Sequence, residues 1–255
     1  MTAATSLEPA RPVSLTGRLR IIARLLAMVV LLLACVPLFY AWRPFARHNP
    51  WPRRFLGGIA WIAGARVRKL GAPARKGAFL LANHVSWLDV PVLAGATGAA
   101  FVAHSGLTES RLLAWLCGMN DTVFVARHDR RSVHEQVGQV RAALSDTGAL
   151  AIFPEGTTSD GTGLLPFKSS LLSALDPAPP GIVAQPIWLD YGPEVAGIAW
   201  VGEEHGLHNF LRILARRRPL AVTLHFLEPF DPAGTGSRKA ISARAREEIL
   251  AAMKT

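Results

Sequence analysis

A histidine and an aspartate stand five positions apart in the segment Asn83–Asp89, NHVSWLD. The apolar run Ala78–Ala82 before them predicts a buried strand. Ser86 can cap a helix that has Asp89 at its third position. In this geometry His84 lies just outside the helix and folds back toward Asp89, which can orient the imidazole and stabilise its protonated form. A base held in this way can take a proton from a hydroxyl group.

The hydroxyl that His84 would activate is expected on the substrate, because the chain has no Gly-x-Ser-x-Gly elbow for a serine nucleophile. An isolated His-x4-Asp pair is more often a helix cap or a surface pair. A second block, Phe153–Thr157 (FPEGT), favours an active site. Both blocks follow predicted strands, and open α/β sheets bind their ligands at the carboxyl ends of the strands.

Together the two blocks resemble those of the glycerolipid acyltransferase family, which includes bacterial 1-acylglycerol-3-phosphate acyltransferases. The family has four sequence blocks, and their counterparts here are residues 84–89, 123–127, 153–157 and 183–187. The resemblance covers roughly residues 70–230, and it is specific because the Pro-Glu-Gly block follows the His-x4-Asp block at the family's distance.

The resemblance implies that His84 is the general base that deprotonates the acceptor hydroxyl and that Asp89 is its partner. The alkoxide would then attack the thioester of an acyl carrier protein or coenzyme A, with no covalent acyl-enzyme. The residues expected to bind substrate are Arg127, Glu155, Gly156, Thr157 and Lys168.

Physical reasons support these roles, and each has an alternative. The fork of Arg127 suits phosphate or carboxylate, but a lone arginine can be a solvated charge at a strand end. Glu155 would hold Arg127 or a glycerol hydroxyl, and Gly156 would let the backbone approach the ligand, but Pro-Glu-Gly can also be an ordinary turn. Lys168 is a second cation near the third block, or a surface lysine at a helix start.

The acceptor expected first is 1-acylglycerol-3-phosphate, whose acylation gives phosphatidic acid. The stretches 157–161 and 165–168 are also similar to family members that acylate lyso-ornithine lipid, whose carboxylate can pair with Arg127 as a phosphate would. A non-catalytic lipid-binding protein of the membrane is the alternative of another class, but it needs neither His84 nor Asp89. The sequence has no zinc-protease, phosphate-loop or dinucleotide motif, so no metal or other cofactor is expected.

Charge is divided unevenly along the chain. Residues 1–76 carry eleven Arg and two Lys against one acidic residue, a net charge of +12. Residues 77–255 carry fifteen basic and seventeen acidic side chains, a net charge of −2. A nucleic-acid-binding protein would place its cations on the folded domain, so no nucleic-acid partner is expected.

The N-terminal cations flank an apolar run of eighteen uncharged residues, 25–42, at the short end of a membrane span. A second apolar stretch, 55–65, is too short to span. Together they predict a membrane-associated helical hairpin that dips into one leaflet, turns back near Pro37 and presents basic rims to anionic head groups. A single true span and a buried core helix stay open as alternatives. A signal peptide is disfavoured because no small-x-small cleavage site follows the run.

The rest of the chain alternates predicted strands and helices, which is typical of an α/β fold with a largely parallel sheet flanked by helices. The predicted strands are 78–82, 100–103, 121–126, 149–153, 181–189, 197–201 and 220–227, and the predicted helices are 86–96, 107–117, 131–145, 168–175, 207–216 and 238–252. We therefore expect a membrane-anchoring segment, 1–68, and an acyltransferase catalytic domain, 69–255. With a leaflet hairpin, the N-terminus and this domain are both expected to face the cytoplasm, at the inner (cytoplasmic) membrane.

Overall fold

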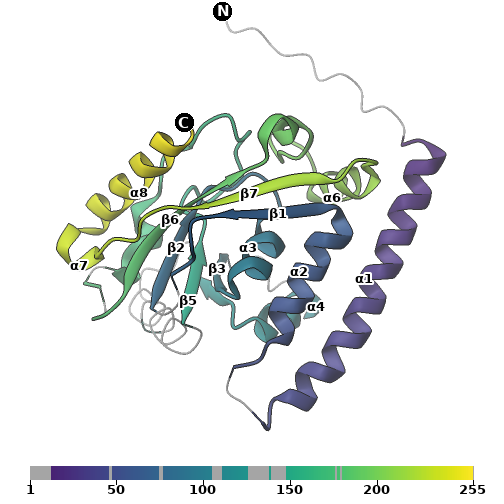
Figure 1. Cartoon of the computed structure of the whole chain (residues 1–255), viewed down its shortest axis with the longest axis horizontal. Coiled ribbons are helices and arrows are strands. Elements are labelled where there is room, and N and C mark those ends of the chain that lie inside the picture. The colour runs from purple at the N-terminus through teal and green to yellow at the C-terminus, as the bar shows by residue number, and fades with distance from the viewer. Residues whose placement is uncertain are drawn as a thin grey trace, which may run out of the picture.

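The computed structural model describes residues 13–45, 48–74, 77–104, 111–125, 138, 148–175, 177–178 and 180–254. Within these ranges one sheet has seven strands in the order β1-β7-β6-β2-β5-β3-β4 (Figure 1). The strands are β1 Ala65–Leu70, β2 Ala78–Ala82, β3 Ala100–His104, β4 Val123–Val125, β5 Ala149–Ile152, β6 Val183–Asp190 and β7 Leu220–Phe226. The strands from β2 to β6 are parallel, β7 is antiparallel to β6, and β1 is parallel to β7. The predicted α/β fold with a largely parallel sheet is confirmed.

Helices cover both faces of this sheet (Figure 1). They are α1 Leu15–Trp42, α2 Trp51–Ala63, α3 Asp89–Thr97, α4 Arg111–Met119, α6 Gly206–Ala215, α7 Pro232–Thr235 and α8 Arg238–Ala252, with the 3-10 segments η3 Ser169–Leu175 and η4 Gly192–Gly197. The hydrophobic core on one face draws on α1, α2, α3 and α6, and the core on the other face draws on η3 and α8. The helix predicted at 131–145 lies outside the described residues, except for residue 138.

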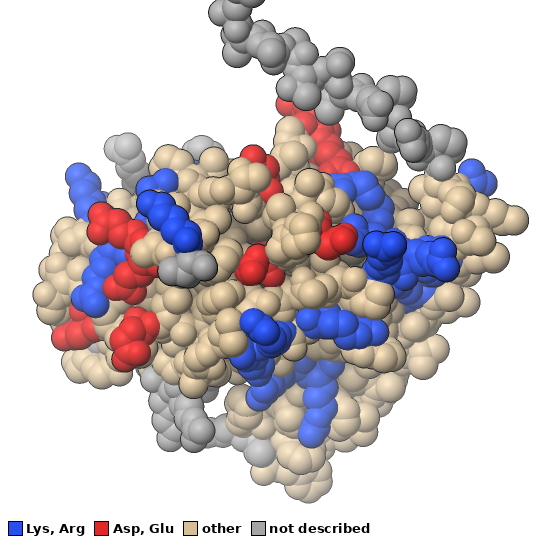
Figure 2. Space-filling view, turned by 45° about the horizontal axis from the view of Figure 1, so that its top comes forward, with Lys and Arg blue, Asp and Glu red and all other residues tan. Residues whose placement is uncertain are grey.

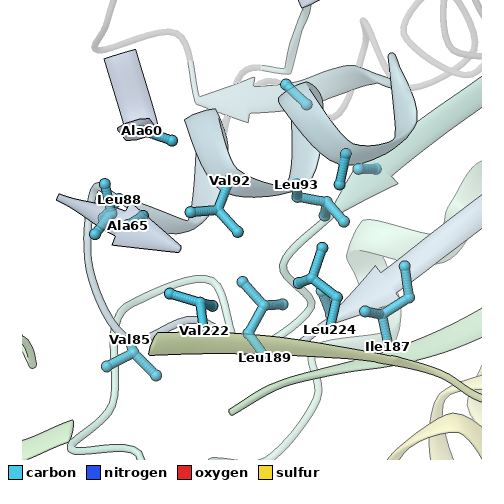
Figure 3. Close-up of a cluster of buried hydrophobic side chains, with 14 of the residues drawn as sticks. Ala60, Ala65, Val85, Leu88, Val92, Leu93, Ile187, Leu189, Val222 and Leu224 are labelled. Carbon is cyan, nitrogen blue, oxygen red and sulfur yellow. The ribbon is translucent and has the colours of Figure 1, made fainter. Parts of the chain in front are cut away.

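The central strand β2 shows why the sequence folds in this way. Leu80 points into the core beneath α3, while Phe79 and Leu81 point into the core beneath α8, and all three are fully buried. A strand covered on both faces reads as a continuous apolar run. On the α3 side, Val92 and Leu93 pack onto apolar side chains of the sheet (Figure 3).

Two predicted elements are wrong. Residues 197–201 form no strand, because the backbone N–H of Trp200 donates to the Val85 carbonyl at 2.9 Å and the carbonyl of Ala199 accepts from Asn209 and Arg212 side chains. The predicted helix at 168–175 is the 3-10 segment η3, in which the Ser173 hydroxyl donates to the Ser170 carbonyl at 2.6 Å. Such side-chain bonds compete with regular helix bonds.

Strand β1 was not predicted, and it contains the predicted domain boundary after residue 68. All six of its residues pair with β7. The sequence ARVRKL does not indicate a strand, because five of its six residues are exposed. Its polar residues interrupt the apolar run by which a buried strand is predicted. The division into an anchoring and a catalytic part stays a prediction.

The N-terminal hairpin consists of α1 and α2, which pack against each other (Figure 1). The predicted turn at Pro37 is wrong, because α1 continues through this proline as a helix of 28 residues. Proline removes one helical hydrogen bond, and the apolar turns on both sides of Pro37 continue the helix. The chain instead reverses between α1 and α2, where Asn49 Nδ2 donates to the Phe39 carbonyl at 3.0 Å and its Oδ1 accepts from Trp51 N–H at 3.1 Å. Among the described residues, α1 is the helix long and apolar enough to cross a membrane.

Four cations of the N-terminal part bind the carboxyl ends of helices. Arg20 donates to the Ala215 carbonyl at 2.6 Å and Arg24 donates to the Leu214 carbonyl at 2.8 Å, at the end of α6. In the same way, Arg53 and Lys69 donate to carbonyls of the last turn of α3. A cation at this position offsets the negative end of the helix dipole. These four side chains therefore contact the protein itself, and for the other cations of the basic rims the contact with head groups stays a prediction.

Candidate active site

The carboxyl ends of β2, β5 and β6 meet at one edge of the sheet, because the three strands are adjacent and parallel. His84 follows β2, Glu155 follows β5, and Tyr191 follows β6 directly. The fold thus brings together residues that lie far apart in the sequence, at the position where open α/β sheets bind their ligands.

Asp89 holds His84 at this edge. His84 Nδ1 lies 2.7 Å from Asp89 Oδ2, and the same oxygen accepts from the backbone N–H groups of Val85 and Ser86 at 2.6 and 2.9 Å. The expected helix start at Ser86 is wrong, because α3 begins at Asp89. Ser86 Oγ instead accepts from Leu88 N–H at 3.1 Å. The sequence predicted Asp89 at the third position of the helix. Asp89 is instead the first residue of α3, and its carboxylate folds back to bind the turn before the helix.

The hydrogen bonds of Asp89 decide which nitrogen of His84 can act as a base. Asp89 Oδ2 accepts from two backbone N–H groups, so it also serves as acceptor for Nδ1–H. Nε2 is then the nitrogen with a free lone pair. The ring stacks on Phe153, with centroids 4.1 Å apart and planes 13° apart, and its side chain is 20% exposed. The His84 ring is thus held by Asp89 and Phe153 and remains partly exposed.

Glu155 holds the backbone of His84. Its Oε1 accepts from His84 N–H at 2.8 Å and its Oε2 accepts from Leu165 N–H at 2.9 Å. The side chain is buried, and burial raises the pKa of the Glu155 carboxyl, while the two backbone donors act in the opposite direction. The His84 carbonyl accepts from Ser159 N–H at 2.8 Å. Glu155 therefore joins the loop after β2 to the loop after β5, and its binding of substrate stays a prediction.

Of the four other residues predicted to bind substrate, the structure describes three and does not describe the fourth. Gly156 adopts a φ of 68°, and a Cβ added there would lie 3.0 Å from Lys168 Nζ. The Lys168 side chain therefore lies against Gly156, in the loop after β5. Thr157 is exposed next to it. Arg127 lies outside the described residues.

Two polar residues of the site had no predicted role. Tyr191 donates its hydroxyl to Asp89 Oδ1 and is fully buried, and burial followed by the Asp89 charge raises the pKa of the phenol well above its usual value. Asn83 exchanges hydrogen bonds with the backbone of Leu189, at 2.7 and 3.1 Å. The position of Tyr191 at the carboxyl end of a strand was the signal that could have found it. In the described part of the chain, no group of three His, Cys, Asp or Glu side chains could hold a metal ion.

Comparisons with known proteins agree with this geometry. A family profile described as "Acyltransferase" matches residues 66–190. A lyso-ornithine lipid O-acyltransferase of Rhizobium meliloti is 33% identical over 91% of this chain and 84% of its own length. A 1-acyl-sn-glycerol-3-phosphate acyltransferase of Neisseria gonorrhoeae is 29% identical over 72% of this chain and 73% of its own length.

A solved structure has the same fold. The crystal structure of the 1-acyl-sn-glycerophosphate acyltransferase PlsC from Thermotoga maritima superposes with a TM-score of 0.63 at 20% identity. The superposition covers 92% of this chain and 96% of that chain, so it includes the N-terminal helices as well as the sheet.

Proposed function

The chain belongs to the acyltransferase family and acts on lysolipids, and we propose that its acceptor is lyso-ornithine lipid. The support is the Rhizobium meliloti relative, which matches more of the chain at a higher identity than the Neisseria gonorrhoeae relative does. The order expected from the sequence, with 1-acylglycerol-3-phosphate first, is thereby reversed. We propose 1-acylglycerol-3-phosphate as the second candidate acceptor, because the Neisseria gonorrhoeae relative is named for it.

The chemistry rests on one observation, the hydrogen bond between His84 Nδ1 and Asp89 in a side chain that is partly exposed. In the proposed reaction, Nε2 takes the proton of the acceptor hydroxyl while the hydroxyl oxygen attacks the thioester carbonyl. The carbon–sulfur bond of the donor then breaks, and the imidazolium returns the proton to the leaving thiolate. Asp89 stabilises the imidazolium between these two steps. The donor is an acyl carrier protein or coenzyme A thioester.

In our proposal, Lys168 and Arg127 bind the acceptor head group. Lys168 lies against Gly156, and Arg127 follows β4 in the sequence. Both can pair with an anionic head group, and the arginine fork suits a carboxylate or a phosphate equally. Thr157 is the exposed hydroxyl of the same loop.

The outer surface of α1 supports membrane association. Its exposed apolar side chains recur every three to four residues and form one stripe, made up of Leu15, Leu19, Ile22, Leu26, Val29, Val30 and Leu33. A helix with such a stripe can lie in the interface of a bilayer. Basic side chains gather on the side of the molecule that carries α1, whereas both signs mix on the side of α8 (Figure 2). We propose attachment to the cytoplasmic side of the inner membrane.

The deciding experiment measures acyl transfer by the full-length chain in vesicles that contain either lyso-ornithine lipid or 1-acylglycerol-3-phosphate, each with an acyl carrier protein thioester and with a coenzyme A thioester. We expect at least about tenfold higher kcat/KM on lyso-ornithine lipid, about 1.4 kcal/mol in transition-state binding. A preference for 1-acylglycerol-3-phosphate would overturn the acceptor assignment, and turnover of neither lipid would overturn the function.

Arg127→Ala should raise KM for the acceptor and leave KM for the donor unchanged.

A further inference from the structure

Tyr191 donates its hydroxyl to Asp89 Oδ1, the carboxylate oxygen that His84 does not contact. It follows β6 directly and is buried in the core beneath α3. We infer that Tyr191 is a positioning residue that fixes the Asp89 carboxylate and thereby sets the pH range in which His84 works. The inference rests on the proposed function, because it assigns Tyr191 a part in the same proton transfer.

The two oxygens of Asp89 have different partners. Oδ2 accepts from the His84 ring and from two backbone N–H groups, and Oδ1 accepts from Tyr191. The carboxylate is fully buried, so these donors replace the water that would otherwise stabilise its charge. Without the phenol, Oδ1 would face the core with no donor from the described residues. The carboxylate would then keep its contact with His84 through Oδ2 but lose the donor that fixes its other oxygen.

The phenol is suited to this role because it stays protonated. Burial and the neighbouring carboxylate both raise the pKa of Tyr191 far above neutral pH. The hydroxyl therefore donates to Asp89 throughout the pH range in which a histidine base operates. A serine or a water at this position would offer a donor that can also turn away, whereas the ring of Tyr191 is packed in the core.

The direction of the pH effect follows from the charges around the pair. Among the described residues, the ionisable groups that face His84 and Asp89 are Tyr191 and Glu155, and Glu155 binds His84 N–H. A donor on Oδ1 draws negative charge away from the oxygen that faces the imidazole. Its removal strengthens the attraction between Asp89 and protonated His84. The free base should then form only at higher pH.

Tyr191→Phe tests the inference, and Tyr40→Phe is a matched control because the chain has two tyrosines. Tyr40 is exposed on α1 and accepts a hydrogen bond from Trp115 Nε1 at 3.0 Å. For Tyr191→Phe we expect kcat to fall about tenfold, both KM values to stay within about twofold, and the acid limb of the kcat/KM profile to move up by roughly half a pH unit. Tyr40→Phe should match the unchanged protein in all three quantities.

Two further measurements keep the result free of folding effects. If Tyr191 acts through Asp89, adding Tyr191→Phe to Asp89→Asn should change kcat by less than about twofold. The titration of the His84 ring by NMR, assigned with His84→Ala, needs no substrate and should move to higher pH in Tyr191→Phe. This readout separates the inference from the acceptor assignment, which can fail on its own. A fall in kcat with an unmoved acid limb and an unmoved ring titration would reduce Tyr191 to a packing residue and overturn the inference.

Discussion

The active-site edge and the outer face of α1 differ in how far their side chains are exposed and in what those side chains contact. At the edge, the Asp89 carboxylate is fully buried and accepts from Tyr191, from the His84 ring and from two backbone groups. On α1, apolar side chains such as Leu26 and Leu33 lie open, with exposed fractions of 62% and 67%. At the active-site edge, the protein itself supplies the hydrogen-bond donors that the buried carboxylate needs. The outer face of α1 needs an apolar partner to cover it, and a bilayer provides one.

The largest effect should come from His84, because it is the one group proposed to carry the proton. His84→Ala should lower kcat by about a hundred- to ten-thousand-fold, the usual contribution of a general base. Binding to vesicles should not change, since the α1 stripe is intact. Acyl-transfer and vesicle co-sedimentation assays measure the two quantities.

The matched control for this variant is His208→Ala, which removes an exposed imidazole on α6 that contacts Glu204. It should keep the kcat of the unchanged protein. If His84→Ala kept most of its turnover, His84 would not be the base, and the edge would lose its chemical role.

Glu155→Ala should produce the next largest effect, on stability. The substitution leaves the partly buried N–H groups of His84 and Leu165 without their acceptor. Each unpaired group costs about 1–3 kcal/mol, partly offset because the buried carboxylate no longer has to be desolvated, so we expect a loss of about 2–4 kcal/mol. Thermal unfolding measures it against the exposed Glu203→Ala. Equal melting temperatures for both variants would show that Glu155 does not hold the two loops together.

A charge placed on the α1 stripe should separate the two regions of the molecule. The triple variant Leu19→Glu, Leu26→Glu, Leu33→Glu removes three exposed apolar side chains, each worth about 1.5–3 kcal/mol when fully buried in an apolar phase. Because partial burial reduces this value, we expect roughly a hundredfold weaker vesicle binding. Transfer to an acceptor dispersed in detergent should persist.

The control for the stripe is the triple Leu→Met variant, which keeps the apolar surface and should bind vesicles as before. A Glu variant that binds vesicles normally would mean that α1 faces something other than lipid. A Glu variant that unfolds in detergent would mean that α1 is covered within the protein.

The sequence predicted the contact between His84 and Asp89 because the information is local. His84 and Asp89 lie five positions apart, and one turn before α3 is enough to bring them into contact. Tyr191 lies 102 positions from Asp89, so only the sheet order places it there. The apolar composition of 197–201 predicted a strand, but this backbone is hydrogen-bonded to Val85 and to side chains of α6. Tertiary hydrogen bonds thus override local propensity.

Charge was harder to interpret from the sequence than apolar pattern. The N-terminal excess of cations suggested lipid head groups, yet Arg20, Arg24, Arg53 and Lys69 bind helix ends within the protein. A net charge cannot distinguish these roles, because the carbonyls that bind the cations belong to helices distant in the sequence. The apolar run 25–42 lies within the long helix α1, although the turn expected near Pro37 does not form.

The two tyrosines give a smaller test of the comparison, through alkaline stability. The raised pKa of Tyr191 means that the folded chain keeps this proton above about pH 10, where the unfolded chain loses it. The stability contributed by Tyr191 is therefore complete below about pH 10 and is lost as the pH rises further. Tyr191→Phe should remove that part of the alkaline decline, about 1 kcal/mol for each pH unit. Tyr40→Phe should show the same decline as the unchanged protein, and identical curves for all three proteins would mean that Tyr191 ionises freely in the fold.

The smallest effect should distinguish cations that bind helix ends from cations that are free for lipid. Arg53 donates to the Gly95 and Ala96 carbonyls at 3.2 and 3.1 Å, whereas its neighbour Arg54 is exposed and lies over the Trp51 ring at 4.8 Å. Arg53→Ala should lower the free energy of unfolding by about 0.3–1 kcal/mol, with little change in binding to anionic vesicles. Arg54→Ala should leave stability nearly unchanged and weaken vesicle binding by about 1 kcal/mol, if this cation faces the head groups. Thermal unfolding and co-sedimentation at two salt concentrations measure both. If the two variants exchanged these effects, Arg53 rather than Arg54 would be the lipid-facing residue, and the helix-end contacts of α3 would contribute nothing to the fold.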